Sequence, residues 1–515
     1  MIDTFATVVP VLEAFHSNRN AGFLALTKRC TDGTRHVTLN GVRGGIVYIV
    51  VLACGLGLSC AKSLDLTGKQ CPCVRNYICD EATNTCVREL PPDSGIDADV
   101  NNPQPIIPVS LALGWGDHYG NRSHSCVLFS DGGLRCWGHS LDRQLGYDRT
   151  TDVGDDELPN ELGLVEINAA VTQVAAGGNH TCALIDDGSV RCWGQNNNGQ
   201  LGRGNAYPTP EGVLPKDADT VSLGEPATQI ASGPRHTCAL LQSGSVRCWG
   251  ANTRGQLGLG HDEDYGAQIN ELPSNQPAIV FPKKVTQITT GGAEFGYGHT
   301  CALLEDGTIR CWGHNGSGEL GYGNTTDVGD HPDRLPASKA AIDVGGPVAQ
   351  IAAGGSRTCA VLVNGSLRCW GDNYSGELGY NHTNNIGDDE VPSTSNPVAL
   401  GGEVLSVDIG YYHSCALLNG GSVRCWGGNY EGYLGYSNTD FVGGSNDNRP
   451  LDHGPVNVGG KVTLLEVGYT HSCVILEDHS VRCWGSNNAG ELGYGHTDNI
   501  GDDEHPHVAG PVPLQ

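Results

Sequence analysis

A fifteen-residue motif that recurs seven times constrains the fold of this chain more than any other feature. One copy, HTCALIDDGSVRCWG, begins at His180, and the first cysteine of each copy stands at residues 126, 182, 238, 301, 359, 415 and 473. Successive copies are 56 to 63 residues apart. A period of this length and regularity is typical of a repeat architecture, in which each repeat forms one structural unit.

Each repeat reads as a set of short β-strands. In the second repeat, alternating residues flank a turn at residues 187–189 and predict a β-hairpin, and residues 171–176 predict a strand before it. A later short strand, such as residues 397–400, completes the unit. With 75 glycines and 17% charged residues, the composition suits short strands joined by tight turns. We therefore expect an all-β fold over residues 106–515, a seven-bladed β-propeller of four-stranded blades.

The repeated string H-[ST]-x-A-L-x-x-[DG]-G-x-V-x-x-W-G, followed by N-x-x-G-x-L-G, resembles the repeat of the regulator of chromosome condensation family over about four fifths of the chain. Members of that family are seven-bladed propellers, so the resemblance implies the blade number that the motif count gives. Residues 510–515 (GPVPLQ) match the piece that precedes each first strand, and residues 106–113 (IIPVSLAL) resemble the strand that should follow. We expect this N-terminal strand to close the ring.

The chain before residue 106 has a different character. Residues 1–40 show no clear periodicity, and we interpret them as a disordered extension or the product of a start codon assigned too early. Residues 41–60 resemble a signal peptide, because a basic residue precedes an apolar run that ends in small residues and a cysteine. We predict lipidation at Cys60, or at Cys54 as the alternative; plain secretory cleavage is the other alternative.

Residues 61–90 read as a small Cys-rich segment, and residues 91–105 as a Pro- and Asp-rich linker with almost nothing to bury. Four cysteines stand in a short polar stretch of the first segment: Cys71, Cys73, Cys79 and Cys86. They predict two disulfide bonds, with a zinc site as the alternative.

In every repeat two cysteines ten positions apart lie symmetrically about the hairpin turn, which places them opposite each other on adjacent strands. A close cross-strand pair has a Cα separation that a disulfide bond tolerates, whereas two thiolates supply only half of a zinc site. We predict seven disulfide bonds within the blades, the alternative being reduced buried thiols. The pairs are Cys126 with Cys136, Cys182 with Cys192, Cys238 with Cys248, Cys301 with Cys311, Cys359 with Cys369, Cys415 with Cys425, and Cys473 with Cys483.

A histidine opens six of the seven motifs: His124, His180, His236, His299, His413 and His471. Because they occur once per blade around a ring, we interpret them as structural hydrogen-bonding groups and not as metal ligands or acid-base catalysts. The arginine before each second cysteine, such as Arg191, is expected to bind acidic loop groups or carbonyls. The tryptophan after that cysteine is expected to pack between blades.

The long loops are the least repetitive part of the chain and the best place for function. Those at residues 147–159, 380–392 and 494–506 share a Gly-Asp-Asp-Glu string. We predict no cofactor and no metal ion, with weak candidates for calcium or another hard cation in these strings. The candidate ligands are Asp155, Asp156, Glu157, Asp388, Asp389, Glu390, Asp502, Asp503 and Glu504.

The formal net charge of −27, from 30 Lys and Arg against 57 Asp and Glu, repels phosphate backbones and argues against a nucleic-acid partner. The chain carries no nucleophile-elbow, Walker, Rossmann, HExxH or kinase signature, so we expect no enzyme. We predict a monomeric, extracytoplasmic interaction scaffold with a protein or glycan partner, either a lipoprotein of the bacterial outer membrane or a secreted protein.

Three alternatives remain open. The family resemblance implies guanine-nucleotide exchange on a small GTPase, an activity of some eukaryotic members, and inhibition of a secreted enzyme, since a β-lactamase inhibitor shares this type of propeller. A propeller hydrolase or lyase would need acid and base groups clustered at one end of the channel.

Overall fold

The computed structural model describes residues 105–116, 122–292, 297–445 and 447–515, together with the backbone of four short strands nearer the N-terminus. The chain divides into two compact units, Met1–Pro103 and Gln104–Gln515. Among the described residues, no helix has the length and apolar character needed to cross a membrane.

The described part of the first unit consists of two antiparallel strand pairs: β1 (Leu64–Asp65) with β2 (Gln70–Cys71), and β3 (Tyr77–Asp80) with β4 (Thr85–Arg88). The Cα register places Cys79 opposite Cys86. The side chains of the predicted Cys71, Cys79 and Cys86 lie outside the described residues, as do the whole of Cys73 and the predicted lipidation sites Cys54 and Cys60.

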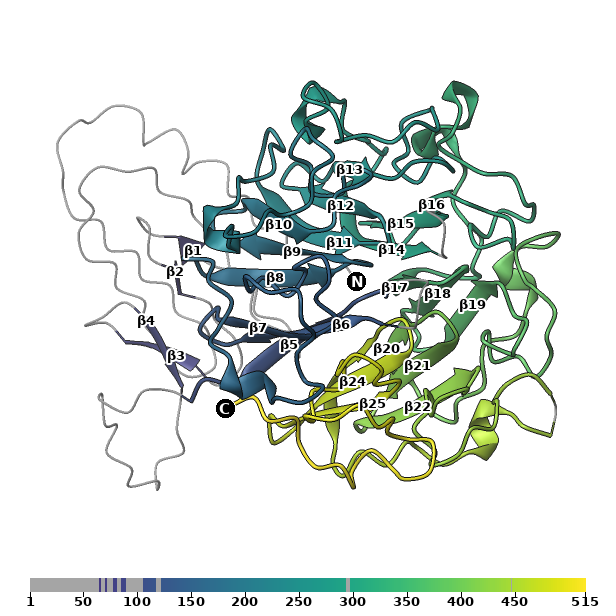
Figure 1. Ribbon diagram of the computed structural model, residues 1–515. Coiled ribbons are helices and arrows are strands. Elements are labelled where there is room, and N and C mark those ends of the chain that lie inside the picture. The colour runs from purple at the N-terminus through teal and green to yellow at the C-terminus, as the bar shows by residue number, and fades with distance from the viewer. Residues whose placement is uncertain are drawn as a thin grey trace, which may run out of the picture. The chain divides into compact units, whose positions relative to one another are not determined.

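The second unit contains seven three-stranded antiparallel sheets, one for each sequence repeat. Figure 1 shows them arranged around a common centre, from the dark blue first sheet to the yellow last sheet. The sheets are β5 (Pro108–Leu113), β6 (His124–Phe129) and β7 (Leu134–Gly138); β8 (Val171–Ala176), β9 (His180–Ile185) and β10 (Val190–Gly194); β11 (Ala227–Ser232), β12 (His236–Leu241) and β13 (Val246–Gly250); β14 (Val285–Gly292), β15 (Gly298–Leu304) and β16 (Ile309–Gly313); β17 (Val348–Gly354), β18 (Arg357–Leu362) and β19 (Leu367–Gly371); β20 (Val404–Ile409), β21 (His413–Leu418) and β22 (Ser422–Gly427); and β23 (Val462–Val467), β24 (His471–Leu476) and β25 (Val481–Gly485). Short 3₁₀ turns interrupt the long loops at η2 (Pro159–Glu161), η3 (Pro215–Asp217), η4 (Pro273–Asn275), η6 (Pro332–Arg334), η7 (Pro336–Ser338), η8 (Pro392–Thr394) and η9 (Pro450–Asp452).

The first strand of each sheet contacts the first strand of the next sheet, so these are the inner strands of the ring: β5, β8, β11, β14, β17, β20 and β23. Each middle strand is buried along its whole length, as β9 is, because both of its faces pack on neighbouring sheets. Antiparallel pairing puts the loops after the first and third strands of every sheet at the same end. We call this end of the ring the loop face.

The prediction of four-stranded blades is wrong by one strand. The expected fourth strand is an extended segment that meets the third strand over one or two hydrogen bonds. Val221 N donates to the Val190 carbonyl at 2.8 Å, and Val398 N donates to the Leu367 carbonyl at 2.9 Å.

The N-terminal strand belongs to the first sheet, and the C-terminal end of the chain lies just before it, where Gln515 Nε2 donates to the Ile106 carbonyl at 2.8 Å. β5 pairs with β6 inside the first sheet, and no described strand is shared by the first and last sheets. Hydrogen bonds connect the two sheets instead: Tyr469 N donates to the Gly114 carbonyl at 3.0 Å, and Trp137 Nε1 donates to the Glu491 carbonyl at 2.9 Å. An equivalent tryptophan contact joins the second sheet to the first.

Candidate functional site on the loop face

Every sheet of the ring contains one disulfide bond between its middle and third strands. The two cysteines face each other in the register, as Cys182 and Cys192 do in β9 and β10, and their Cα atoms lie 4.0–4.1 Å apart. The seven pairs are those that the hairpin spacing predicts, and all fourteen cysteines are buried. A buried disulfide in each sheet is typical of a protein that folds in an oxidising compartment.

The recurring histidines connect neighbouring sheets. His180 Nε2 lies 2.9 Å from Thr237 Oγ1, and this hydroxyl donates to the Gln200 carbonyl at 3.0 Å, so the imidazole is the donor. Burial lowers the pKa of His180 to about 3, which keeps the ring neutral. The bond to a hydroxyl of the next sheet, 2.8–3.2 Å long, recurs at His124, His236, His299, His413 and His471.

Six of the seven recurring arginines and six of the seven recurring tryptophans bind main-chain carbonyls among the described residues. Arg191 Nη1 donates to the Ile167 carbonyl at 2.8 Å, and Trp193 Nε1 donates to the Gln144 carbonyl at 2.9 Å. In the fifth sheet Arg357 replaces the histidine, and it donates to the carbonyls of Gly410 and Tyr411 of the sixth sheet. These residues hold the ring together and leave the loops free to vary.

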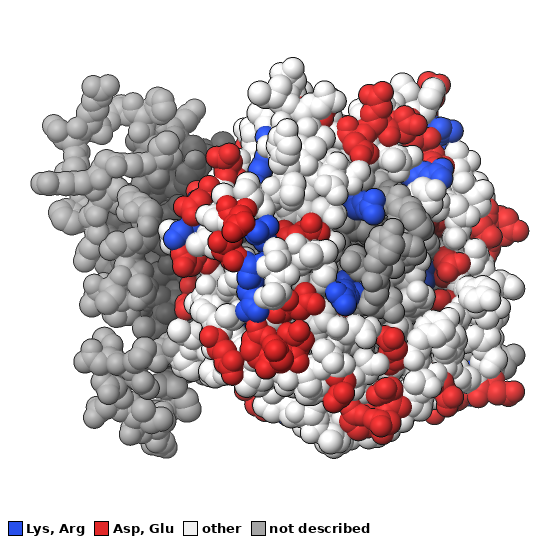
Figure 2. All heavy atoms as spheres, viewed as in Figure 1, with Lys and Arg blue, Asp and Glu red and all other residues white. Residues whose placement is uncertain are grey.

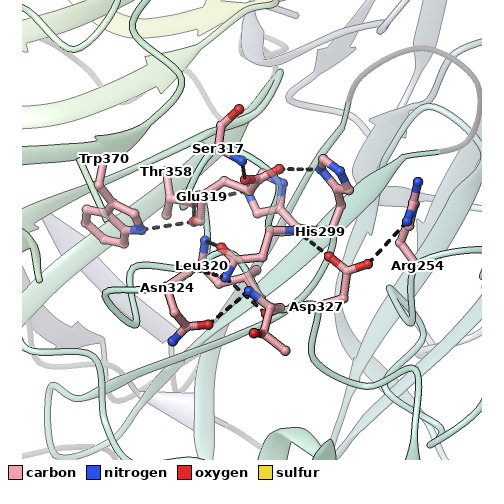
Figure 3. Close-up of polar contacts among 12 residues, drawn as sticks. Arg254, His299, Ser317, Glu319, Leu320, Asn324, Asp327, Thr358 and Trp370 are labelled. Atoms are coloured by element: carbon pink, nitrogen blue, oxygen red, sulfur yellow. Dashed lines mark hydrogen bonds and ion pairs between the residues drawn. The ribbon is translucent and has the colours of Figure 1, made fainter. Parts of the chain in front are cut away.

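Figure 3 shows a polar network on the loops of the third and fourth sheets. The buried Glu319 carboxylate accepts from Ser317 N at 2.8 Å, and its other oxygen lies 2.5 Å from His314 Nδ1. The Glu319 carbonyl accepts from Thr358 Oγ1 at 2.8 Å and from Trp370 Nε1 at 2.9 Å. Burial alone would lower the pKa of His314, but the Glu319 carboxylate outweighs burial and raises it.

Arg254 of the third blade completes this network. Its guanidinium carbon lies 4.5 Å from the centroid of the Tyr297 ring, and the group is 3.6 Å from the Asp327 carboxylate. The Tyr297 ring stacks on His314 at 5.2 Å, and Asp327 accepts from Asn315 N at 2.9 Å. The charged groups of this part of the loop face are therefore paired with one another. We call Arg254, His314, Glu319 and Asp327 the polar sector.

The residue that occupies the position of Glu319 differs from blade to blade. In the other blades it is Gln144, Gln200, Gln256, Glu377, Tyr433 or Glu491. Glu377 lies 4.0 Å from Arg357. Glu491 is fully buried and accepts from Ala489 N at 2.6 Å, while its other oxygen has no hydrogen-bond partner among the described residues. Burial raises the pKa of Glu491 to about 8.

Two carboxylates occupy an inner-strand position that holds a small residue in the other sheets. Asp408 lies in β20 and Glu466 in β23, where the other five inner strands have Ala112, Ala175, Ala231, Thr289 and Ala352. Asp408 Oδ2 accepts from Val467 N at 2.6 Å. Burial raises the pKa of Asp408 to about 7, and burial together with the charge of Asp408 raises the pKa of Glu466.

Each of the three Gly-Asp-Asp-Glu strings brings its three carboxylates together. One ligand oxygen of each residue lies within 4.8 Å of the others in all three strings. In the first string Arg149 lies 2.7 Å from Glu157 and supplies a positive charge from within the protein. Burial and the neighbouring carboxylates raise the pKa of Glu390 and Glu504 to about 7. These carboxylates could hold a hard cation, but exposed acidic groups are common without one, and we assign none.

Aromatic side chains gather on the loops of the fifth to seventh sheets. We call them the aromatic sector: Tyr374, Tyr411, Tyr412, Tyr430, Tyr433, Phe441 and Tyr469. Ring centroids are 4.8 Å apart between Tyr469 and Tyr411, 4.6 Å between Tyr411 and Tyr412, 5.4 Å between Tyr412 and Tyr430, and 4.7 Å between Tyr430 and Phe441. Tyr433 is buried, whereas Tyr430 is 51% exposed and Tyr374 is 82% exposed.

The sequence prediction did not include this sector. Tyr374 and Tyr430 each follow a buried asparagine, at a position that is Leu141, Asn197, Thr253, Gly316 or Asn488 in the other blades. Comparing the repeats position by position would have revealed two adjacent blades with an aromatic residue at this position.

Asp and Glu side chains form several patches on the face shown in Figure 2, whereas Lys and Arg side chains there are fewer and scattered. This distribution agrees with the net charge of −27. The described surface therefore favours positively charged partners over negatively charged ones.

Comparison with known families gives matches over most of the ring. A family model described as the regulator of chromosome condensation (RCC1) repeat matches residues 131–184, 187–240 and 243–303. A second model of the same repeat matches residues 171–200, 227–256, 293–319, 348–377, 404–432 and 462–491.

Among characterised proteins, the chain is 31% identical over 384 residues to the ultraviolet-B receptor UVR8 of Arabidopsis thaliana. This match covers 72% of this chain and 77% of the receptor. It is 29% identical to the probable E3 ubiquitin-protein ligase HERC6 of Homo sapiens over 59% of this chain, but this match spans only 27% of the ligase.

Solved structures show the same fold. Yeast RCC1 (Prp20), in its complex with Kap60, matches with a TM-score of 0.55 and 22% identity, over 72% of this chain and 83% of that one. Human WBSCR16 matches with a TM-score of 0.54 and 19% identity, over 72% of this chain and 92% of that one.

Proposed function

Because the chain belongs to the regulator of chromosome condensation (RCC1) repeat family, we propose that it is a non-enzymatic protein-interaction scaffold that acts outside the cytoplasm of a bacterium. The observation that carries this proposal is the buried disulfide bond in each of the seven sheets, because structural disulfides persist in oxidising compartments. The signal-peptide-like residues 41–60 support the same location and favour a lipoprotein of the cell envelope, with secretion as the alternative.

The loop face supports a binding role. Its long loops differ from blade to blade and stand on a ring whose sheets are joined by hydrogen bonds, which is the usual arrangement of a binding surface on a rigid scaffold. The buried histidines have pKa values lowered to about 3 or 4 and are engaged between sheets, so they are poor general bases at neutral pH.

The test is to express the full chain with its own leader in a bacterial host, fractionate the cells and measure the intact mass with and without reductant. We expect an envelope protein with a lipidated N-terminus and the fourteen ring cysteines oxidised. A cytosolic protein with free thiols would overturn the proposed location. Accelerated nucleotide release from a small GTPase would favour the alternative, a guanine-nucleotide exchange factor, for which the likeness to yeast RCC1 supports the fold alone.

A further inference from the structure

We propose that the aromatic sector and the carboxylates around it bind a lysine- or arginine-rich segment of a partner polypeptide. This inference rests on the proposed scaffold function, since it names the class of partner that the loop face would take.

Two exposed tyrosine rings are the first observation. Tyr374 and Tyr430 occupy equivalent positions in neighbouring blades, and they are 82% and 51% exposed. Four of the other five blades fold with a small or polar residue at this position, so the fold does not require an aromatic ring there. Tyrosine combines a large apolar face with a polar tip, which suits a contact surface.

The loops that carry these two rings are joined into one surface. Gly376, two residues after Tyr374, packs so closely on the backbone of Gly443 and Gly444 that a Cβ atom would not fit. Phe441 lies two residues before Gly443, and its ring centroid is 4.7 Å from that of Tyr430. The fifth-blade loop and the sixth-blade rings are therefore neighbours on the loop face.

The charge of this part of the ring is strongly negative. Residues 348–515 contain 19 Asp and Glu but only 6 Lys and Arg. Of these six, Arg357 is buried, Arg368 and Arg424 donate to main-chain carbonyls, and Arg449 lies 2.6 Å from Asp452. The basic side chains of this region are therefore largely engaged within the protein.

Carboxylates also stand beside the exposed rings. Glu431 follows Tyr430 directly and its Oε2 lies 3.4 Å from the hydroxyl of Tyr433, and Asp440 precedes Phe441. A lysine or arginine side chain laid on this surface would meet aromatic faces and carboxylates together, which is the environment that a cation–π contact needs. The same negative charge disfavours a phosphate-bearing partner.

The test measures binding of a labelled dodecapeptide of alternating lysine and glycine to the full oxidised chain by fluorescence anisotropy. A glutamate–glycine peptide and an N-acetylglucosamine oligomer are the comparison probes. We expect the variant Y374A/Y430A to bind the basic peptide roughly tenfold more weakly, because two cation–π contacts are lost. The matched control is Y207A, which removes a ring that is 76% exposed on a loop of the second blade, and we expect its affinity to be unchanged.

A second variant, E431Q/D440N, should weaken binding and reduce its dependence on salt. Equal affinities for Y374A/Y430A and Y207A would show that only the overall charge attracts the peptide, and would overturn the proposal. Binding of the sugar oligomer in place of the peptide would also overturn it. If the chain lies in the cell envelope and captures a partner whose binding Y374A/Y430A does not change, the scaffold function stands and this inference is refuted. If the chain is cytosolic but its peptide binding depends on the two tyrosines, this inference stands and the proposed location is refuted.

Discussion

The polar and aromatic sectors of the loop face are built on the same loop backbone but use it differently. In both, a buried asparagine fixes the loop: Asn315 Oδ1 accepts from Leu320 N, and Asn429 Oδ1 accepts from Leu434 N, each at 2.9 Å. In the polar sector the adjoining side chains pair with one another, as His314 does with Glu319. In the aromatic sector the residue after the asparagine, Tyr430, points its ring toward solvent and its neighbours. Because the asparagine bond is present in both loops, other positions around it, such as that of Tyr430, are free to take on a function.

The largest expected effect concerns Glu319 and Glu491, which occupy the same position in two blades. We expect E491Q to leave the free energy of unfolding unchanged near pH 4 and to raise it by on the order of 4 kcal/mol at pH 9. The pKa of Glu491 is raised to about 8 in the folded state, so its ionisation costs stability increasingly as the pH rises from about 4.5 through 8. Glutamine fits, since Gln144 occupies this position in the first blade. Denaturant titrations at several pH values measure the effect.

The matched variant E319Q should behave in the opposite way. The raised pKa of His314 means that its pairing with Glu319 stabilises the fold fully below pH 6.5 and loses this contribution as the pH rises through the folded-state pKa. We expect E319Q to destabilise the protein at pH 6 and to do so less at pH 9. Stabilisation by both variants at pH 9 would show that the polar sector is not internally neutralised.

Removal of a disulfide bond should give the next largest effect on stability. It tests whether the sheets beneath the two sectors differ, as the loops above them do. We expect C301S/C311S under the polar sector and C415S/C425S under the aromatic sector each to lower the free energy of unfolding by about 2–3 kcal/mol, because both bridges close loops of the same length. Thermal unfolding of each variant beside the parent chain measures this. A clear inequality would contradict the view that the two sectors stand on equivalent sheets.

The parts of the molecule that the sequence predicts are those that repeat. The cysteine spacing of ten residues predicts both the hairpins and their disulfides, because one register satisfies both in every sheet. The fourth strand was predicted wrongly because each extended segment meets the third strand over only one or two hydrogen bonds, and the local sequence does not show how far such pairing extends. Contacts between repeats escape this reasoning: Arg254 and Asp327 are 73 residues apart, and no local pattern connects them. The aromatic sector was missed because it departs from the repeat, and departures appear only when the blades are compared.

Glutamines on the inner strands provide a smaller test. Gln229 Nε2 donates to the Ile288 carbonyl at 2.9 Å and its Oε1 accepts from Ile288 N at 2.8 Å, which ties the third sheet to the fourth. On the aromatic side Leu464 occupies this position and forms no such bond. We expect Q229A to cost about 1–2 kcal/mol, equally at pH 5 and pH 8, since no ionisable group is removed. L464A is the comparison variant. If the loss of unfolding free energy in Q229A depended on pH, the hydrogen bonds of the inner strands would be coupled to ionisable groups.

The smallest expected effect is the most informative about the aromatic sector. Y374A and Y430A should each change the free energy of unfolding by less than about 0.5 kcal/mol, because exposed side chains contribute little to the core. Y433A, at a residue that is 1% exposed only three positions after Tyr430, should cost about 3 kcal/mol through the cavity it leaves. Urea titrations of the three variants give the comparison. Near-neutral stability with weakened peptide binding would mean that the exposed rings serve recognition, whereas a loss above about 1 kcal/mol in Y374A would mean that the ring packs as part of the fold and that the aromatic sector is not a free surface.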